Sequence, residues 1–374
     1  MRLEELNENE LKKLSKKELK KLLDQDTRYL RDKKVKQILY DNKEWYTSRA
    51  VFGNWWANWF VFIGARERGK TYTVQDYVLG EWFNKDSPMY HVPFYLMRLN
   101  DVAIKNMIMN NGAKLFESLL VPKYHLEKIK VKGDTVYYEG NILCYVFSLS
   151  TAYNYKGASL FSAKDFKGAR IIIDEVALEK GQRKTFDVVY NLKMQIENIV
   201  RHERENVKVF MLLNNTEDCP ELVAMFGFVP IEFGTYKLKR KHCVIDYIPN
   251  NKAYDERRKK ALANEIDSGT GNFTNKVARD LSLLNKKRLH KPSYIIKFYK
   301  EQDHWYTVWD DKIICPYKGE KVRTIAMRRG LDDYFIPSSR DDVIALYDVR
   351  AYTYKDILTK SLIDKEITQL KGSR

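Results

Sequence analysis

The sequence has few cysteines: four in 374 residues, at Cys144, Cys219, Cys243 and Cys315. They lie far apart and form no Cys-x-x-Cys pair, which argues against both a disulfide framework and a zinc ribbon. The six histidines also lack the spacing of metal ligands, so we expect no structural metal. This composition fits a reduced, intracellular setting.

Long apolar runs are missing as well. The longest spans roughly residues 55–63 and is too short to cross a bilayer. The N-terminal stretch MRLEELNENELKK is too polar for a signal peptide. We therefore expect a cytoplasmic protein that is neither secreted nor membrane-bound.

Acidic residues are outnumbered: 50 Asp and Glu face 66 Lys and Arg, which gives a net charge of +16. Such an excess indicates a polyanionic partner, either nucleic acid or an anionic membrane surface. The alternative is that the charge only keeps the protein soluble. A hydrophobic content of 44% is enough for a real core.

The length suggests about two domains with smaller pieces attached. Residues 1–48 contain ELKKLSKKELKKLLDQ, which predicts a basic amphipathic helix. This helix either docks on the main domain or forms an arm that touches a partner subunit or nucleic acid. Residues 49–250 are predicted to form the main domain, residues 251–291 a helical linker or lid, and residues 292–374 a small α+β domain.

Short apolar runs alternate with helical patterns in the main domain, which favours an α/β fold with a mostly parallel sheet and helices on both faces. The predicted strands are Trp59–Ile63, Pro93–Arg98, Arg170–Ile173, Val207–Leu213 and His242–Tyr247, with a hairpin formed by Thr135–Glu139 and Ile142–Ser148. The predicted helices are Thr71–Phe83, Lys105–Leu120 and Thr185–Arg204. In the last domain, YIIKFYK, HWYTVW and DKIICPY predict an antiparallel meander before a less defined end.

One junction carries a specific motif. After the strand at Trp59 comes Gly64-Ala65-Arg66-Glu67-Arg68-Gly69-Lys70-Thr71, which matches G-x-x-x-x-G-K-T, the P-loop, and a helical pattern follows. The loop's backbone N–H groups would cradle the phosphates of ATP, with Tyr72 beside them. Lys70 would reach the β- and γ-phosphates, and Thr71 would hold Mg²⁺.

The stretch ARIIIDEVALEK supplies the acids that a P-loop needs. Asp174 ends a buried strand and would share the Mg²⁺ with Thr71. Glu175 follows directly, where a carboxylate can deprotonate an attacking water. This pairing favours a hydrolysing motor over a small-molecule kinase.

Further polar residues stand at element ends. Asn214 ends the strand VKVFMLL, where its amide could bind the γ-phosphate or the water. Arg201 and Arg204 end the helix before that strand, and either stabilise transition-state charge in a neighbouring subunit or are solvated cations at a helix C-terminus. Lys180 is a weaker candidate for the same role.

Lysines mark possible DNA contacts. The loop SLSTAYNYKGASLFSAKDFKG interleaves Lys156, Lys164 and Lys167 with tyrosines, so it either faces a pore and touches phosphates or is an ordinary surface loop. Lys105, at the start of the predicted helix Lys105–Leu120, is a further possible DNA contact.

Together, GARERGKT, IIIDE with its following lysine, the helix ending in arginines and the strand ending in NN resemble the viral DNA-packaging ATPases. The resemblance is to the compact kind from small tailed phages, related to large terminases and to FtsK/HerA-type translocases. It covers about residues 50–250 with specific motifs and the rest more loosely.

The resemblance implies a P-loop fold of the ASCE type and a homo-oligomeric ring, typically a pentamer. Such a ring hydrolyses ATP between subunits and drives double-stranded DNA through the portal of a capsid, so its place is the host cytoplasm and, transiently, the portal vertex. It also implies an RNase H-like C-terminal domain without its catalytic acids, which contacts the portal or a structural packaging RNA. By motif position, Arg201 would be the trans-acting finger and Lys180 its helper.

Other functions stay open. A terminase-type enzyme with an active C-terminal nuclease is the first alternative, although the part after Ser293 is short for one. A helicase or another DNA translocase is the second, and a P-loop scaffold without turnover is the third.

Overall fold

A computed structural model describes the protein at residues 15, 45–47, 49–151, 166–175, 186–201, 205–214, 220–260, 282–284, 292–296, 306–309, 313–316, 344–345, 347–348, 353–354 and 356–372. The chain divides into two compact units, one of residues 1–216 and 232–277, the other of residues 217–231 and 278–374. Almost all of the predicted N-terminal helix lies outside the described residues.

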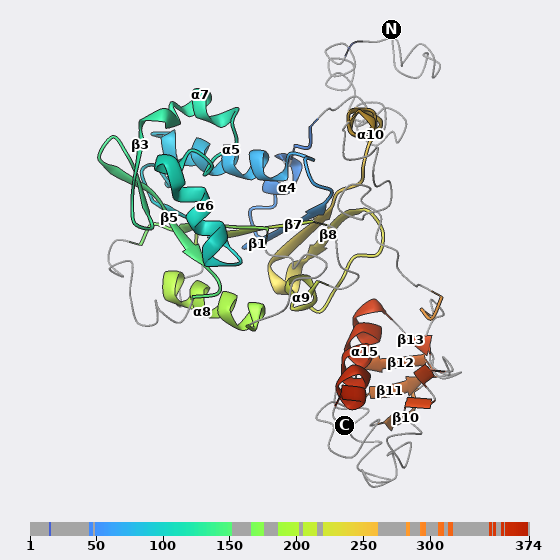
Figure 1. The fold of residues 1–374 in the computed structure, drawn as a ribbon. Coiled ribbons are helices and arrows are strands. Elements are labelled where there is room, and N and C mark those ends of the chain that lie inside the picture. Colours follow the sequence, from blue (N-terminus) through green and yellow to red (C-terminus); the bar gives the residue numbers. More distant parts are fainter. Residues whose placement is uncertain are drawn as a thin grey trace. The chain divides into compact units, whose positions relative to one another are not determined.

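The first unit is built on a nine-stranded sheet with the order β3-β4-β5-β2-β6-β7-β1-β9-β8 (Figure 1). Its strands are β1 (Trp59–Gly64), β2 (Phe94–Arg98), β3 (Ile129–Lys132), β4 (Thr135–Tyr138), β5 (Asn141–Ser148), β6 (Ala169–Asp174), β7 (Val207–Asn214), β8 (Gly234–Leu238) and β9 (Cys243–Tyr247). The pairs from β5 to β9 are parallel, and antiparallel strands close both sides. The predicted mixed α/β fold with a mostly parallel sheet is therefore confirmed.

Helices cover both faces of this sheet. The helices of this unit are α4 (Arg49–Phe52), α5 (Lys70–Phe83), α6 (Asp101–Gly112), α7 (Leu120–Tyr124), α8 (Val188–Val200) and α10 (Lys252–Lys259), with short 3₁₀ turns η3 (Leu126–Lys128) and η6 (Lys239–Lys241). In Figure 1, α5 and α7 lie on one face and α8 on the other. No helix in the described parts of the chain combines the length and the apolar character that a membrane crossing needs.

The core lies between α5 and the sheet. Alternate residues of neighbouring strands point to this face, and the register pairs Phe60 with Phe210 and Phe62 with Leu212. Trp82 of α5 and Phe94 of β2 complete a cluster that is almost fully buried. Truncating one of these aromatic side chains to alanine would lower the free energy of unfolding by about 3–5 kcal/mol. Because this core packs α5 on the sheet, it also fixes the P-loop that leads into α5.

Two predicted helices are shorter in the structure. The helix predicted over Lys105–Leu120 is wrong in extent, because Asn110 and Asn111 adopt left-handed backbone angles and α6 ends at Gly112. Asparagine tolerates this conformation, and the Asn111 side chain bonds the backbone of Ile129 and Val131. The helix predicted over Thr185–Arg204 spans only Val188–Val200, since Arg201 leaves helical geometry with a φ of 51°.

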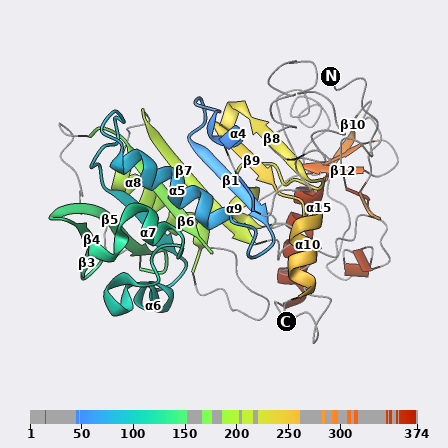
Figure 2. The same ribbon diagram turned by 90° about the horizontal axis from the view of Figure 1, so that it is seen from above.

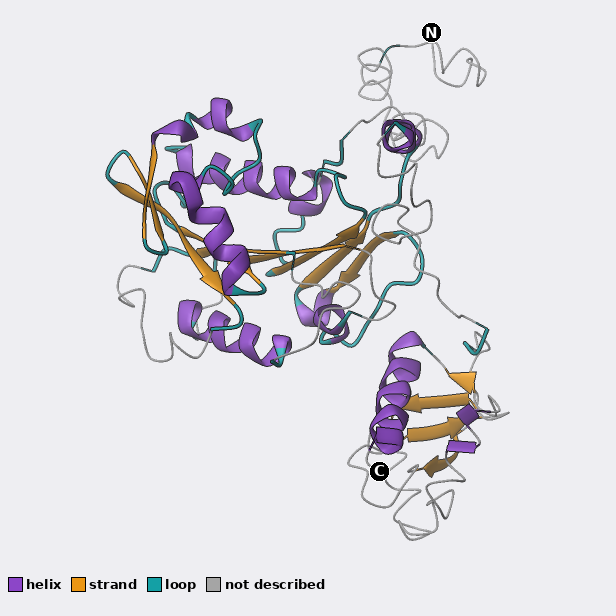
Figure 3. Ribbon diagram, viewed as in Figure 1, coloured by secondary structure: helices purple, strands orange, loops and turns teal. Residues whose placement is uncertain are grey.

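The second unit contains a four-stranded sheet in the order β10-β11-β12-β13, with α15 packed against it (Figure 3). Its elements are α9 (Glu221–Ala224), β10 (Pro292–Ile296), β11 (Tyr306–Trp309), β12 (Ile313–Pro316), β13 (Thr353–Tyr354) and α15 (Ile357–Gly372). The first three sheet strands are antiparallel, as the meander prediction requires, and β13 joins in parallel. The expectation of a less defined end is wrong for α15, which buries Ile357, Ile363 and Ile367 on one side.

Candidate active site

The P-loop motif forms the link between β1 and α5. β1 ends at Gly64 and α5 begins at Lys70. Gly69 has a φ of 91°, which favours glycine, and a Cβ on Gly64 would come within 3.2 Å of the Ile248 Cβ. The first N–H groups of α5 therefore open towards the loop, the usual arrangement for holding an anion.

Lys70 is buried at the centre of this loop, with 6% of its surface exposed. Its Nζ donates to the carbonyl oxygens of Gly64 at 2.9 Å and Ala65 at 2.7 Å, and to Oδ1 of Asn214 at 3.3 Å. Burial lowers the pKa of Lys70 to about 8, because the charged ammonium loses its water; Asp174 opposes part of that shift. The site thus holds a cation that a phosphate would stabilise.

The strand order explains why Asn214 lies here. β7 lies between β1, which leads into the P-loop, and β6, which ends in Asp174. Gly64 pairs with Asn214 across β1 and β7, and Asp174 pairs with Leu212 across β6 and β7. The carboxyl ends of three parallel strands therefore bring the P-loop, the amide and the acid to one edge of the sheet.

Asp174 is buried at that edge. The hydroxyl of Thr71 donates to its Oδ2 across 3.4 Å. Burial raises the pKa of the Asp174 carboxyl, and the guanidinium of Arg98 acts in the opposite direction. A hydroxyl next to a carboxylate is an oxygen donor set of the kind that Mg²⁺ prefers, so these two residues fit the metal.

Arg98, which the sequence reasoning missed, bridges the two acids. It ends β2, next to β6 in the sheet, and its Nη2 lies 3.3 Å from Oδ2 of Asp174. Its Nη1 pairs with Glu175, whose side chain is half exposed and whose backbone is left-handed, with a φ of 51°. The signal was available, since the strand Pro93–Arg98 was predicted to end in a charged residue at this same edge.

Glu117 was also missed, and no motif marks it. It follows α6 in a loop where its N–H donates to Oε1 of Gln75 at 2.9 Å. Partial burial raises the pKa of its carboxyl, and the charge on Asp174 adds to the shift. Glu117 is thus a third carboxyl group close to the two predicted acids.

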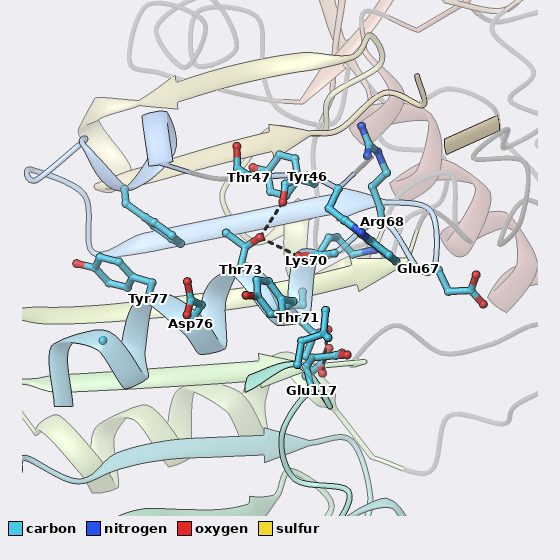
Figure 4. Close-up of a pocket in the computed structure, with 18 of the residues that line it drawn as sticks. Tyr46, Thr47, Glu67, Arg68, Lys70, Thr71, Thr73, Asp76, Tyr77 and Glu117 are labelled. Atoms are coloured by element: carbon cyan, nitrogen blue, oxygen red, sulfur yellow. Dashed lines mark hydrogen bonds between the residues drawn. The ribbon is translucent and has the colours of Figure 1, made fainter. Parts of the chain in front are cut away.

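One cavity of about 1590 Å³ is lined by the P-loop, by Asn214 and by the three carboxylates, and it also takes in Trp45, Tyr46 and Thr47; Arg98 is not among its lining residues. The Tyr46 N–H donates to the carbonyl of Arg68 at 3.0 Å, and the Thr73 hydroxyl donates to the Tyr46 carbonyl at 2.9 Å (Figure 4). The cavity exceeds the usual range for small-ligand pockets, roughly 300–1,000 Å³, so a nucleotide fits with room to spare.

Helix α10 contacts the P-loop through hydrogen bonds and an ion pair. The Tyr254 hydroxyl donates to the carbonyl of Arg66 at 3.0 Å, and Arg258 pairs with Glu67 at 2.6 Å. Arg68, one of the predicted cradle residues, is 1% exposed and lies 5.6 Å from the Tyr254 ring. The charged residues of the loop thus anchor it to α10.

The remaining predicted residues fall in several places. Arg201 is exposed at the end of α8 and is not among the residues that line the cavity. Lys105 lies on α6, and Lys167 precedes β6 at the opposite, amino-terminal end of that strand. The predicted site residues that lie outside the described part of the chain are Lys156, Lys164, Lys180 and Arg204.

The fold and the residues at its strand ends define a mixed α/β protein with a P-loop sequence beside a buried acid. No family model matches the chain, and no curated protein does either. Among solved structures, the Phi-28 gp11 DNA packaging motor is similar with a TM-score of 0.56 and 15% identity, over 88% of this chain and 98% of that one.

The bacteriophage Phi-29 viral genome packaging motor assembly is similar with a TM-score of 0.53 and 16% identity, over 88% of this chain and 99% of that one. The large terminase of a thermophilic bacteriophage matches more weakly, with a TM-score of 0.34 and 13% identity, over 84% of this chain and 81% of that one. The chain therefore has the fold of the phage DNA packaging motors.

Proposed function

We propose that this protein is an ATP-hydrolysing motor that moves double-stranded DNA into a preformed viral capsid. The observation that carries the proposal is the strand order, which brings Lys70, Asn214 and Asp174 together in the lining of one cavity. The similarity of fold to two phage packaging motors, over 88% of the chain, supports the same function.

In this proposal the phosphates of ATP lie against the first N–H groups of α5 and the ammonium of Lys70. Thr71 and Asp174 hold Mg²⁺, which when bound neutralises charge on the β- and γ-phosphates. Glu175 accepts a proton from water as the water oxygen bonds to the γ-phosphorus and the bond from that phosphorus to the β,γ-bridging oxygen breaks. Asn214 orients the water or the γ-phosphate.

The working form is a homo-oligomeric ring, with five subunits as the expected number, in which ATP is hydrolysed at subunit interfaces. Arg201 is the finger that reaches the neighbouring subunit's phosphate. The partners are duplex DNA, the capsid portal and a structural packaging RNA, and the place of action is the host cytoplasm and the portal vertex. The second unit acts as an RNase H-like domain without nuclease activity.

Phosphate release by the purified protein, compared with the Glu175→Gln variant, tests the hydrolytic step. Glutamine keeps the shape of the side chain but cannot take a proton, so turnover should fall about 100-fold or more while ATP binding stays within a few fold. Lys70→Ala should instead lose binding. A Glu175→Gln variant that turns over at the parent rate would refute the assignment of the base.

The same samples, incubated with linear duplex DNA and run on a gel, address the alternative function. An intact duplex is expected. Divalent-dependent cleavage that survives Lys70→Ala would favour a terminase-type enzyme with an active nuclease.

A further inference from the structure

We propose that the protein binds a nucleic-acid strand with unpaired bases at a second site, formed by two turns at the amino-terminal end of the sheet. The site consists of Trp55 and of the basic residues Lys239, Arg240, Lys241 and His242. We call it the tryptophan-lysine turn. It goes beyond the proposed function, because the motor proposal assigns no residue to a strand with unpaired bases and its site is the cavity at the carboxyl ends of the strands.

Trp55 is the most exposed large hydrophobic side chain among the described residues, at 84%. It lies in the turn between α4 and β1, and it is held there by backbone contacts. The Ala57 N–H donates to the carbonyl of Asn54 at 3.0 Å, and the buried Asn54 amide donates to the carbonyl of Val51 at 2.9 Å. A large indole on a fixed turn is available for contact at little cost in conformational entropy.

The basic turn is joined directly to the tryptophan turn. The His242 carbonyl accepts from the N–H groups of Asn58 and Trp59, both at 2.9 Å. The Nδ1 of His242 lies 3.2 Å from the carbonyl of Trp56. These contacts join the two turns, and Trp55 is the sequence neighbour of Trp56, which His242 contacts.

The cations on this surface are exposed and consecutive. η6 spans Lys239–Lys241 between β8 and β9, and all three side chains point into solvent, with His242 beside them. β9 runs parallel to β1, with Cys243 opposite Trp59, so the turn lies where β1 begins. β1 ends in the P-loop, and the strand therefore separates the tryptophan-lysine turn from the phosphate cavity.

Phosphates and unpaired bases fit this chemistry. Lys and Arg side chains neutralise successive phosphates, and an exposed indole stacks on a base whose face is free. In a duplex the base faces are covered, so Trp55 would gain nothing there. A docking protein would need a wider apolar patch, whereas here a single exposed indole lies on a turn that is joined to a turn of exposed cations.

Fluorescence anisotropy of the full-length chain with labelled single strands of roughly 12 nucleotides tests the site. RNA and DNA single strands are separate arms, because either could supply the unpaired bases, and a duplex of the same length is a third. Trp55→Ala should weaken single-strand binding about tenfold, and Trp55→Phe should restore most of it. Duplex binding should be the same with and without Trp55.

The contribution of the three charged residues is tested against a matched control variant. Lys239→Ala/Arg240→Ala/Lys241→Ala should lower the slope of log affinity against log salt by about 2 for single strands. Lys128→Ala/Lys130→Ala/Lys132→Ala removes the same number of charges around β3, on the opposite side of the sheet (Figure 2), and should leave that slope unchanged. ATP hydrolysis without nucleic acid should equal the parent rate in all of these variants.

Several results would overturn the proposal. One is single-strand binding that is absent in the parent or unchanged in Trp55→Ala. Another is a Trp55→Ala variant that loses as much affinity for the duplex as for the single strand. A third is a β3 control variant whose salt slope falls as much as that of the variant without Lys239, Arg240 and Lys241. Loss of capsid-protein binding in place of nucleic-acid binding would show a protein-docking surface instead. None of these readouts depends on ATP turnover, so a failure here is distinguishable from a failure of the motor proposal.

Discussion

Lys70 is a residue whose pKa should depend on whether the site holds a phosphate. Its ammonium is buried, and it is held by two carbonyl oxygens and one amide oxygen, which carry no full charge. The pKa of about 8 records the cost of that burial. A phosphate would supply the missing negative charge, and binding should therefore raise the pKa of Lys70 again.

ATP affinity should consequently depend on pH in the alkaline range. The empty site loses its Lys70 proton as the pH rises through about 8, while ATP binds the protonated form, so the dissociation constant should increase above that pH. Each pH unit beyond the pKa should weaken binding up to tenfold. Isothermal titration calorimetry between about pH 7 and pH 9.5 measures the effect.

Lys70→Arg is the control, because a guanidinium stays charged over this whole range. Its affinity, whatever its absolute value, should be flat with pH. A parent protein with an equally flat profile would contradict the buried, titrating lysine.

At the scale of elements, the sequence was informative where a local pattern decides the structure. The P-loop, the apolar strands and the acid at the end of β6 follow from glycine positions and from hydrophobic runs, and they were predicted. β3 and β8 were not predicted, because they are short edge strands with exposed polar residues and lack the run of apolar residues that marks a buried strand. The strand that ends in Arg98 was predicted, but its place next to β6 follows from the strand order, so the contacts of Arg98 with the two acids were missed.

α10 is the element whose role only the structure shows. Its sequence predicts a helix of a linker or lid, yet Tyr254 is fully buried and bonds the P-loop backbone. The helix therefore helps to fix the conformation of the loop that precedes Lys70.

Tyr254→Phe should loosen that loop. The variant loses one buried hydrogen bond, worth about 1 kcal/mol, so ATP should bind roughly fivefold more weakly and the free energy of unfolding should fall by a similar amount. Equilibrium denaturation and ATP titration measure the two effects. Tyr190→Phe removes a hydroxyl from an exposed side chain on α8 and should change neither; equal effects in both variants would contradict a specific role for α10.

At the scale of the whole molecule, Arg201 offers a test that distinguishes an ATPase ring from a monomeric ATPase. α8 leads from the acid-bearing end of β6 back towards the start of β7, and Arg201 ends it on the exposed surface, away from the cavity of its own chain. An arginine in this position can act on a phosphate only if the phosphate belongs to another subunit.

Arg201→Ala should therefore reduce turnover about 1,000-fold or more in assembled rings. Mixing it with Glu175→Gln subunits should restore part of the activity, since one variant keeps the base and the other keeps the finger. Lys193→Ala, an exposed residue on the same helix, should have no effect. Absence of rescue at every mixing ratio would contradict a role in trans.

Protection of DNA by capsids tests most directly whether this protein packages DNA. Duplex DNA, empty capsids with their portal, the purified protein and ATP are incubated together, and the DNA that survives added nuclease is measured. ATP-dependent protection is expected with the parent chain and none with Glu175→Gln. An enzyme that hydrolyses ATP in the presence of DNA and capsids, yet leaves all the DNA open to nuclease, would contradict the assignment as a packaging motor.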